Sequence, residues 1–167
     1  ASDNDVFDAM CIKYGIVRCA TLDDMIETAL AFQSGRLPKG DGMAFMSNSG
    51  GVVDLMHDHA GQENARMPQL SPATSKAIRK LVGPDMPLQN PMDCGQAGFA
   101  DERNYMRVCE AVSKDQQIHM VAFEARTPNA PGGKSPEALR ELADRTTLPI
   151  FAFCRMGHAP SEYGRQF

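Results

Sequence analysis

Hydrophobic positions along the chain follow two patterns that alternate from one end to the other. Short continuous apolar runs are typical of buried strands, and they occur at residues 43–46, 118–123 and 148–154. Between these runs, apolar residues recur three or four positions apart, which predicts amphipathic helices. The predicted helices cover roughly residues 3–14, 22–33, 52–60, 73–81 and 102–113, and a further helix begins at Ser135.

Three shorter segments are predicted to be extended. Residues 16–19 form a short strand or a link, residues 65–67 are a candidate strand, and residues 88–95 run into a turn at 93–95. Strands that alternate with helices of about ten residues predict βαβ units, a parallel sheet and helices on both of its faces. The predicted fold class is therefore α/β.

Two helix starts carry specific signals. Thr21 is a good N-cap, and Asp24 completes a near-capping box with it. Ser71 is an N-cap followed by Pro72 at the first helical position. These signals fix where the second and fourth predicted helices begin.

The turn after the first apolar run is the main candidate site. Small residues and two glycines join the strand to the next helix. The candidate ligand-binding residues of this turn are Asn48, Ser49, Gly50 and Gly51. A strand–turn–helix layout leaves unpaired N–H groups at a helix N-terminus, where the partial positive charge attracts anions, phosphate above all. Glycine allows another group to approach the backbone closely. The alternative is a tight βα turn that binds nothing.

Ligands of parallel sheets bind beyond the carboxyl ends of the strands. Loops 47–51, 124–134 and 155–161 follow the three clear strands and lie at such ends. They are the predicted functional edge of the sheet.

Composition narrows the class of protein. The 167 residues carry a formal charge of −4, which argues against a nucleic-acid or membrane-surface role. No apolar run approaches the ~20 residues of a membrane span. The five cysteines are scattered without a Cys-x-x-Cys pair, so they predict reduced thiols in a cytoplasmic protein and neither a disulfide framework nor a zinc site.

Other candidate residues have structural alternatives. Asp54 and His57 are three apart on a helix and could share a site, but they and His59 lack the spacing of a zinc pair, and we predict no metal site. Asp93, with Asn90 and Gly95, is either a loop contact for a ligand or the residue that holds a turn. The remaining candidates are a core histidine, a loop histidine and a loop thiol: His119, His158 and Cys94.

Several motifs together resemble one family. Residues 7–18 and 21–25 resemble a joint in the nucleoside-diphosphate-forming acyl-CoA synthetases, relatives of succinyl-CoA synthetase. Leu37-Pro38-Lys39-Gly40 and residues 44–51 are similar to the next strand and glycine turn of that family. Leu70 to Thr74 and Asn90 to Gly95 resemble its Leu-Ser-x-x-Thr and Asn-Pro-x-Asp-x-Gly elements, in the same order and spacing.

This resemblance implies a flavodoxin-like, three-layer sandwich with a mainly parallel sheet, the second such domain of the family. Residues 1–36 would be a helical linker from a preceding domain, and residues 37–167 the domain itself. The family's final strand, expected after Phe167, is missing, which implies truncation at the C-terminus. In the family, two helix N-termini face a phosphohistidine, so Asn48, Ser49, Gly50 and Gly51 would bind the phosphoryl group, with Asn90, Asp93 and Gly95 as further loop contacts.

The Ser-His-Thr-Gly loop that bears the family's phosphohistidine is absent, as are the CoA-binding and ATP-grasp segments, so no catalytic residue is expected in this fragment. The complete enzyme would be an oligomeric acid–thiol ligase that uses ATP or ADP, Mg and CoA and works through acyl phosphate and phosphohistidine. Its CoA-binding, phosphohistidine and ATP-grasp domains or subunits would be the partners of this chain. The alternatives are a non-catalytic regulatory or assembly module of the same fold, and a free-standing phosphate- or nucleotide-binding domain.

Overall fold

The computed structural model describes residues 4–95, 102–124 and 135–153. The chain divides into two compact units, Ala1–Arg36 and Leu37–Phe167.

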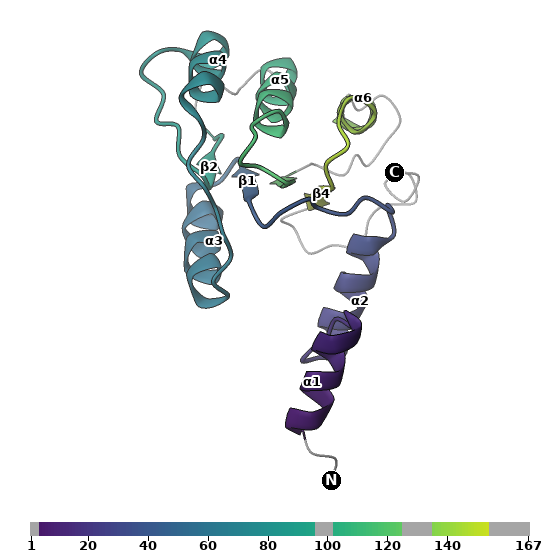
Figure 1. The fold of residues 1–167 in the computed structure, drawn as a ribbon. Helices are drawn as coiled ribbons and strands as arrows, with labels where there is room; N and C mark the ends of the chain where they lie inside the picture. Colours follow the sequence, from purple (N-terminus) through teal and green to yellow (C-terminus); the bar gives the residue numbers. More distant parts are fainter. Residues whose placement is uncertain (1–3, 96–101, 125–134, 154–167) are drawn as a thin grey trace. The chain divides into compact units, whose positions relative to one another are not determined.

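The first unit contains helices α1 (Asn4–Tyr14) and α2 (Leu22–Phe32), joined by residues 15–21 (Figure 1). Gly15 ends α1 with φ +64°, a left-handed conformation that glycine adopts without strain. The predicted capping box of α2 is confirmed: the Thr21 hydroxyl accepts from the Asp24 N–H (3.1 Å), and the Asp24 carboxylate accepts from the Thr21 N–H (3.0 Å). Residues 16–19 are a link and not a strand.

The second unit is built on a four-stranded parallel sheet. Its strands are β1 (Met43–Ser47), β2 (Met92–Asp93), β3 (Met120–Glu124) and β4 (Ile150–Phe153), in the order β2-β1-β3-β4. The central register pairs Met46 with Met92 on one side of β1 and with Phe123 on the other. The α/β class predicted from the alternating patterns is confirmed.

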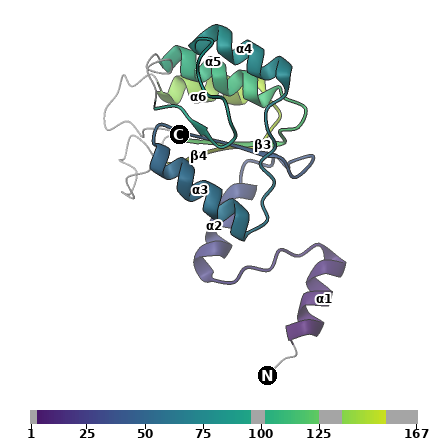
Figure 2. The ribbon, with the colours of Figure 1, turned by 90° about the vertical axis from the view of Figure 1, so that its left-hand side faces the viewer.

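Helices cover both faces of this sheet. Helices α4 (Pro72–Val82), α5 (Glu102–Ser113) and α6 (Ser135–Arg145) lie on one face, and α3 (Gly50–Gln62) lies on the other (Figures 1 and 2). The start predicted for α4 is confirmed, because the Ser71 hydroxyl accepts from the Thr74 N–H (3.3 Å) and Pro72 is in the first turn. None of the helices in the described ranges has the length and apolar character needed to cross a bilayer.

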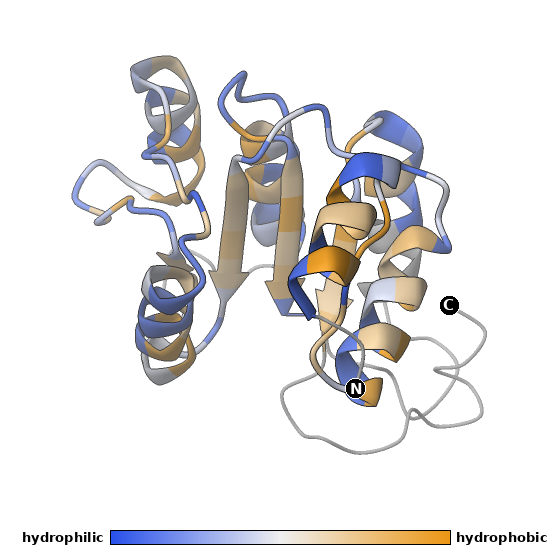
Figure 3. Cartoon of the chain, turned by 60° about the horizontal axis from the view of Figure 1, so that its bottom comes forward, coloured by the Kyte–Doolittle hydropathy of each residue, from blue (hydrophilic) through white to orange (hydrophobic). Residues whose placement is uncertain are grey.

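The core lies between the sheet and the α4–α5 layer. The strands are coloured mostly toward the hydrophobic end of the scale, whereas the helices alternate (Figure 3). This alternation is expected, since a helix buries one face only. The largest fully buried side chains of this cluster are Phe123, Met46, Ile78, Met92, Val108, Val112 and Val121.

Two predictions about extended segments need correction or refinement. Residues 65–67 are not a strand: the Arg66 carbonyl accepts from the Met43 N–H (2.9 Å), but the described residues there form no ladder with the sheet. Residues 88–95, predicted only as extended, contain the edge strand β2. Its two residues are too few for an apolar run, so the pattern could not reveal it.

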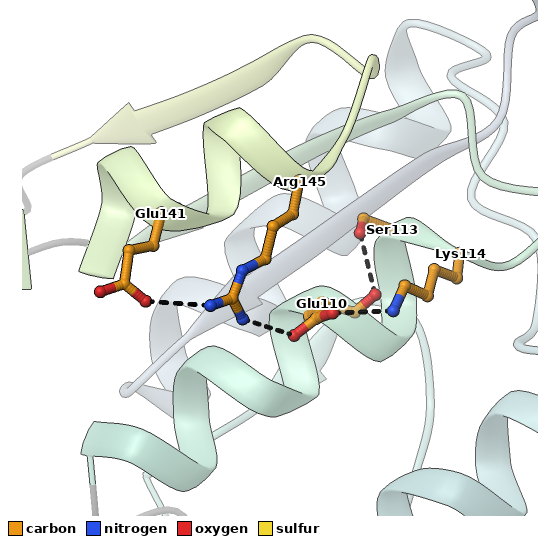
Figure 4. A network of polar contacts seen from close by, with 5 residues as sticks. All are labelled: Glu110, Ser113, Lys114, Glu141 and Arg145. Carbon is orange, nitrogen blue, oxygen red and sulfur yellow. Dashed lines mark hydrogen bonds and ion pairs between the residues drawn. The ribbon is translucent and has the colours of Figure 1, made fainter. Parts of the chain in front are cut away.

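A network of charges joins α5 to α6 (Figure 4). Glu110 accepts from Lys114 (2.7 Å) and from Arg145 (3.5 Å), and Arg145 also contacts Glu141 (3.3 Å). The hydrogen bond from Lys114, together with the two positive charges, lowers the pKa of Glu110. Because these side chains are partly or largely exposed, each pair stabilises the fold by at most about 1 kcal/mol.

Asp115 ties the start of α4 to the segment before β3. Its buried carboxylate accepts from the backbone N–H groups of Ser71 (2.8 Å) and Gln117 (3.0 Å). Burial alone would raise the pKa of Asp115, but these hydrogen bonds, with those from the side chains of Thr74 and Ser71, outweigh it and hold the pKa below its usual value. The carboxylate therefore stabilises the folded state in its charged form.

We expect this contribution to disappear in acid. A carboxyl group whose pKa is lower in the folded than in the unfolded chain contributes stability above the unfolded value of about 3.9, and loses it as the pH falls further. Asp115→Asn should be less stable than wild type by about 1–3 kcal/mol at pH 7, and the difference should shrink between about pH 4 and pH 2. Urea unfolding across that range measures it, and a difference independent of pH would contradict the assignment.

Candidate functional site

The candidate site lies where the strand order changes direction. From β1 the chain moves to β2 on one side, and then returns to β3 on the other side of β1. In parallel α/β sheets, ligands bind in the crevice at the carboxyl ends of the two strands that flank such a switch point. Here these ends are Ser47 of β1 and Glu124 of β3.

The first half of the predicted turn is held by the chain itself. One oxygen of Glu124, Oε2, accepts from the Ser47 hydroxyl (2.6 Å) and from the Asn48 N–H (3.0 Å). The Ser47 oxygen in turn accepts from the Ser49 N–H (3.2 Å). The N–H groups of Asn48 and Ser49 are therefore engaged inside the protein, so any contact of these residues with a ligand falls to their side chains.

The second half of the turn is open. Ser49 is the N-cap of α3, and its carbonyl accepts from the N–H groups of Val52 and Val53 (3.1 Å each). In the part of the chain that the structure describes, the N–H groups of Gly50 and Gly51 form no hydrogen bond. Gly51 is exposed, and a Cβ at its position would have no atom within 4 Å. Two unpaired amides thus begin a helix of 13 residues, beside open space.

Asp93 and Gly95 lie against this turn. The Cys94 N–H donates to the Ser47 carbonyl (2.7 Å), which joins the end of β2 to the end of β1. Asp93 Oδ1 accepts from the Gly95 N–H (2.8 Å), so the carboxylate holds a turn. Its second oxygen faces α3, because a Cβ built on Gly50 would lie 3.2 Å from Asp93 Oδ2.

Gly95 allows the two loops to approach one another. A Cβ at this position would lie 2.8 Å from the Asn48 carbonyl oxygen and 3.1 Å from Asp93 Oδ1. These distances leave no room for a side chain, so glycine is required for close contact between the loop after β2 and the turn after β1. Six of the predicted residues are therefore neighbours: Asn48, Ser49, Gly50, Gly51, Asp93 and Gly95.

Asn90 is placed differently from the others. Its side chain is buried and bonded entirely to backbone: Oδ1 accepts from the Phe45 N–H (3.1 Å), and Nδ2 donates to the carbonyls of Met43 (2.8 Å) and Pro68 (2.9 Å). It therefore continues the hydrogen bonding of β1 before the start of the short strand β2. Both polar atoms of its side chain are thus engaged by the protein backbone.

The other candidate groups lie away from this site or are unsuited to catalysis. His57 and His59 are exposed on α3, and among the described residues no cluster of three or more His, Cys, Asp or Glu side chains could hold a metal ion. His119 accepts from the Gly42 N–H (3.1 Å) at the opposite end of the strands. Burial raises the pKa of the Cys94 thiol, which makes it a poor nucleophile. His158 and most of loops 124–134 and 155–161 lie outside the described residues.

Sequence reasoning missed the roles of Ser47 and Glu124. Both side chains are buried, at 0% and 6% exposure, and they meet across neighbouring strands. The available signal was a carboxylate directly after an apolar run, at the carboxyl end of a predicted strand. Identifying its partner required the register of β1 and β3, which places Met46 opposite Phe123.

Comparisons with known proteins agree with this architecture. No family model matches the chain. It is 25% identical over 160 residues to the alpha subunit of ADP-forming acetate–CoA ligase II of Pyrococcus furiosus, a match that covers 92% of this chain and 34% of that protein. It is 27% identical over 121 residues to ADP-forming acetate–CoA ligase II of Archaeoglobus fulgidus, covering 71% of this chain and 18% of that protein.

Solved structures also resemble this fold. A protein of Pyrococcus horikoshii superposes with a TM-score of 0.78 at 23% identity, over 99% of this chain and 38% of that one. The dinucleotide-forming acetyl-coenzyme A synthetase 1 of Candidatus Korarchaeum cryptofilum, in complex with phosphate and ADP, superposes with a TM-score of 0.71 at 18% identity, over 91% of this chain and 33% of that one.

The strand order, the parallel register and the helices on both faces define a flavodoxin-like α/β domain, which confirms the predicted fold class. The chain spans about a third of the length of its Pyrococcus furiosus relative, and less of the other curated proteins. It is similar in sequence to ADP-forming CoA ligases and matches one part of these larger proteins, which is the resemblance that its motifs predicted.

Proposed function

We propose that this chain is the second flavodoxin-like domain of an ADP-forming acyl-CoA synthetase, and that the N-terminus of α3 binds the phosphoryl group. The complete enzyme would interconvert acyl-CoA, ADP and phosphate with free acid, CoA and ATP, through acyl phosphate and phosphohistidine. The phosphohistidine, CoA-binding and ATP-grasp domains or subunits would be its partners in an oligomeric, cytoplasmic enzyme. No residue of this chain is assigned to magnesium, CoA or nucleotide.

The observation that carries the proposal is the pair of unpaired amides at Gly50 and Gly51, located at the switch point of the sheet. Two N–H groups at the start of a helix can both donate to one phosphoryl oxygen or to two neighbouring ones. The side chains of Asn48 and Ser49 can add donors, since Asn48 is exposed and the Ser49 hydroxyl makes no capping bond to the helix. The relative solved with phosphate and ADP supports a phosphate-linked role for this fold.

The electrostatics favour brief occupation over tight binding. A helix N-terminus contributes about 0.3–1 kcal/mol toward an anion at an exposed site. Asp93 faces Gly50 and Glu124 lies behind the turn, so two carboxylates oppose that attraction. Weak binding suits a site that receives a phosphoryl group from one partner and releases it to another, because a deep energy minimum would slow release.

The proposal is tested with inorganic phosphate and the isolated chain. We expect the backbone amide NMR signals of Gly50 and Gly51 to shift on titration, with a dissociation constant on the order of millimolar. Gly50→Val should weaken this binding about tenfold, because its Cβ would lie 3.2 Å from Asp93 Oδ2 and must displace the carboxylate or the turn. In the complete enzyme the same variant should slow histidine phosphorylation.

A substitution at the other end of α3 provides the control. Gly61→Ala adds a methyl group that has no atom within 4 Å, so phosphate binding should be unchanged. If neither Gly50 nor Gly51 responds to phosphate, or if Gly50→Val binds it as wild type does, the proposed site is wrong. Parallel titration with ADP and ATP identifies a free-standing nucleotide-binding domain, the main alternative.

A further inference from the structure

A single carboxylate from the neighbouring strand fixes the turn that carries the free amides. Oε2 of Glu124 accepts two hydrogen bonds from the turn after β1, one from the Ser47 hydroxyl and one from the Asn48 N–H. The Ser47 oxygen in turn accepts a hydrogen bond from the Ser49 N–H. Three consecutive residues are therefore positioned by one oxygen atom, directly or through one intermediate.

The sheet and α5 hold Glu124 in place. Because β1 and β3 pair in parallel with Met46 opposite Phe123, Glu124 is the next residue along β3 and reaches Ser47 across the sheet. The Tyr105 hydroxyl donates to the Glu124 backbone carbonyl (3.3 Å), and its ring packs edge-on against Phe123 with 6.4 Å between ring centroids. The carboxylate is thus a rigid anchor, and the turn follows its position.

We propose that Glu124 is a positioning residue for phosphoryl binding. It engages the Asn48 N–H directly and the Ser49 N–H through the Ser47 hydroxyl, so that in the described turn the N–H groups of Gly50 and Gly51 remain for a ligand. It thereby holds the turn in the conformation that leaves these two amides unpaired. This inference rests on the proposed function and deepens it. Glu124 does not touch the phosphoryl group; it acts through the turn.

The geometric and electrostatic effects of Glu124 oppose one another, and two variants separate them. Its hydrogen bonds order the amides, which favours anion binding, whereas its negative charge disfavours it. Glu124→Gln keeps an acceptor oxygen but removes the charge, and Glu124→Ala removes both. If positioning is the role, Gln should bind phosphate at least as tightly as wild type, and Ala should bind it about tenfold more weakly.

The experiment measures phosphate binding and folding stability in the same proteins. Inorganic phosphate is titrated into wild type, Glu124→Gln, Glu124→Ala and Ser47→Ala while the Gly50 and Gly51 amides are followed by NMR, and urea unfolding gives the stability of each. Hydrogen exchange of the Asn48 and Ser49 amides, without phosphate, reports the order of the turn. Exchange should accelerate at both residues in Glu124→Ala, and at Ser49 in Ser47→Ala, which should also bind phosphate several-fold more weakly.

Asp115→Ala is the matched control. It removes another buried carboxylate that accepts two backbone N–H groups, in the segment that precedes β3 and so at the other end of that strand. It should lower stability and leave the dissociation constant for phosphate unchanged. This separates a general loss of stability from a specific loss of positioning, and Ser47→Ala provides the same test if Glu124→Ala does not fold.

The possible failures are distinguishable. If wild type shows no response to phosphate at Gly50 and Gly51, the proposed function fails and the positioning role fails with it. If wild type responds to phosphate, and Glu124→Ala and Ser47→Ala both bind phosphate as tightly as wild type does, the positioning role of Glu124 is overturned and the proposed function stands. A loss in Glu124→Gln as large as that in Glu124→Ala would also overturn it, since the conservative variant would then have failed to restore the turn.

Discussion

Gly42→Ala should lose about 3 kcal/mol of its free energy of unfolding, the largest effect expected of any single added methyl group in the described residues. A Cβ at Gly42 would lie 1.9 Å from the Gln117 carbonyl oxygen, which belongs to the backbone and cannot rotate away as a side chain could. Gly42 is also hydrogen-bonded to the start of β3, because its carbonyl accepts from the N–H groups of His119 (2.7 Å) and Met120 (3.2 Å). Relieving the clash must therefore displace the start of β3.

Urea unfolding monitored by circular dichroism measures this loss, and Gly61→Ala is its control. The two variants undergo the same chemical change, but Gly61 has open space around its Cβ position and lies within α3. Alanine has the higher helix propensity, so Gly61→Ala should be neutral or more stable by up to about 1 kcal/mol. Equal midpoints for Gly42→Ala and wild type would show that β1 and β3 do not approach as described.

The second large effect is expected at Asn90. Asn90→Ala removes the partners of the Phe45 N–H and of the Met43 and Pro68 carbonyls, in a position where the side chain is 3% exposed. A buried polar group left without a hydrogen bond costs about 1–3 kcal/mol, and partial entry of water would reduce the sum. We therefore expect a loss of about 3 kcal/mol, comparable to that of Gly42→Ala.

Asn104→Ala is the control for this substitution. Its side chain makes one long hydrogen bond, from Nδ2 to the Leu81 carbonyl (3.4 Å), at a half-buried position on α5. Its removal should cost less than about 1 kcal/mol. If the two variants unfold at the same urea concentration, the side-chain amide of Asn90 does not substitute for strand backbone in the way its geometry indicates.

Much of the fold was predictable because its determinants are local. The apolar runs that form β1, β3 and β4 and the capping signals of Thr21 and Ser71 lie within a few residues of the structure they specify. Parallel pairing followed from the alternation of strands and helices. The candidate strand at 65–67 was wrong, since so short an apolar segment does not distinguish a strand from a loop that makes one hydrogen bond to β1.

The site was predictable only in part, because its organisation depends on pairing between distant segments. The turn at Gly50 and Gly51 could be recognised from its own residues, and the motif at 90–95 suggested a second loop. The internal hydrogen bonds of the Asn48 and Ser49 N–H groups could not be predicted, because they depend on Glu124. This residue is 76 positions from Asn48 along the chain. Asn90 shows the converse. It lies in a motif that suggested a ligand contact, but its side chain is hydrogen-bonded to the backbone of β1.

The buried thiols of Cys94 and Cys109 have a consequence for the chemistry of the interior. Both are almost fully buried, and burial raises the pKa of each, that of Cys109 to about 12. Oxidants and alkylating agents attack the thiolate, so these two sulfur atoms are protected twice, by enclosure and by protonation. Cys109 lies 3.9 Å from the sulfur of Met46, so these two sulfur atoms pack together in a part of the core that such reagents do not reach while the domain stays folded.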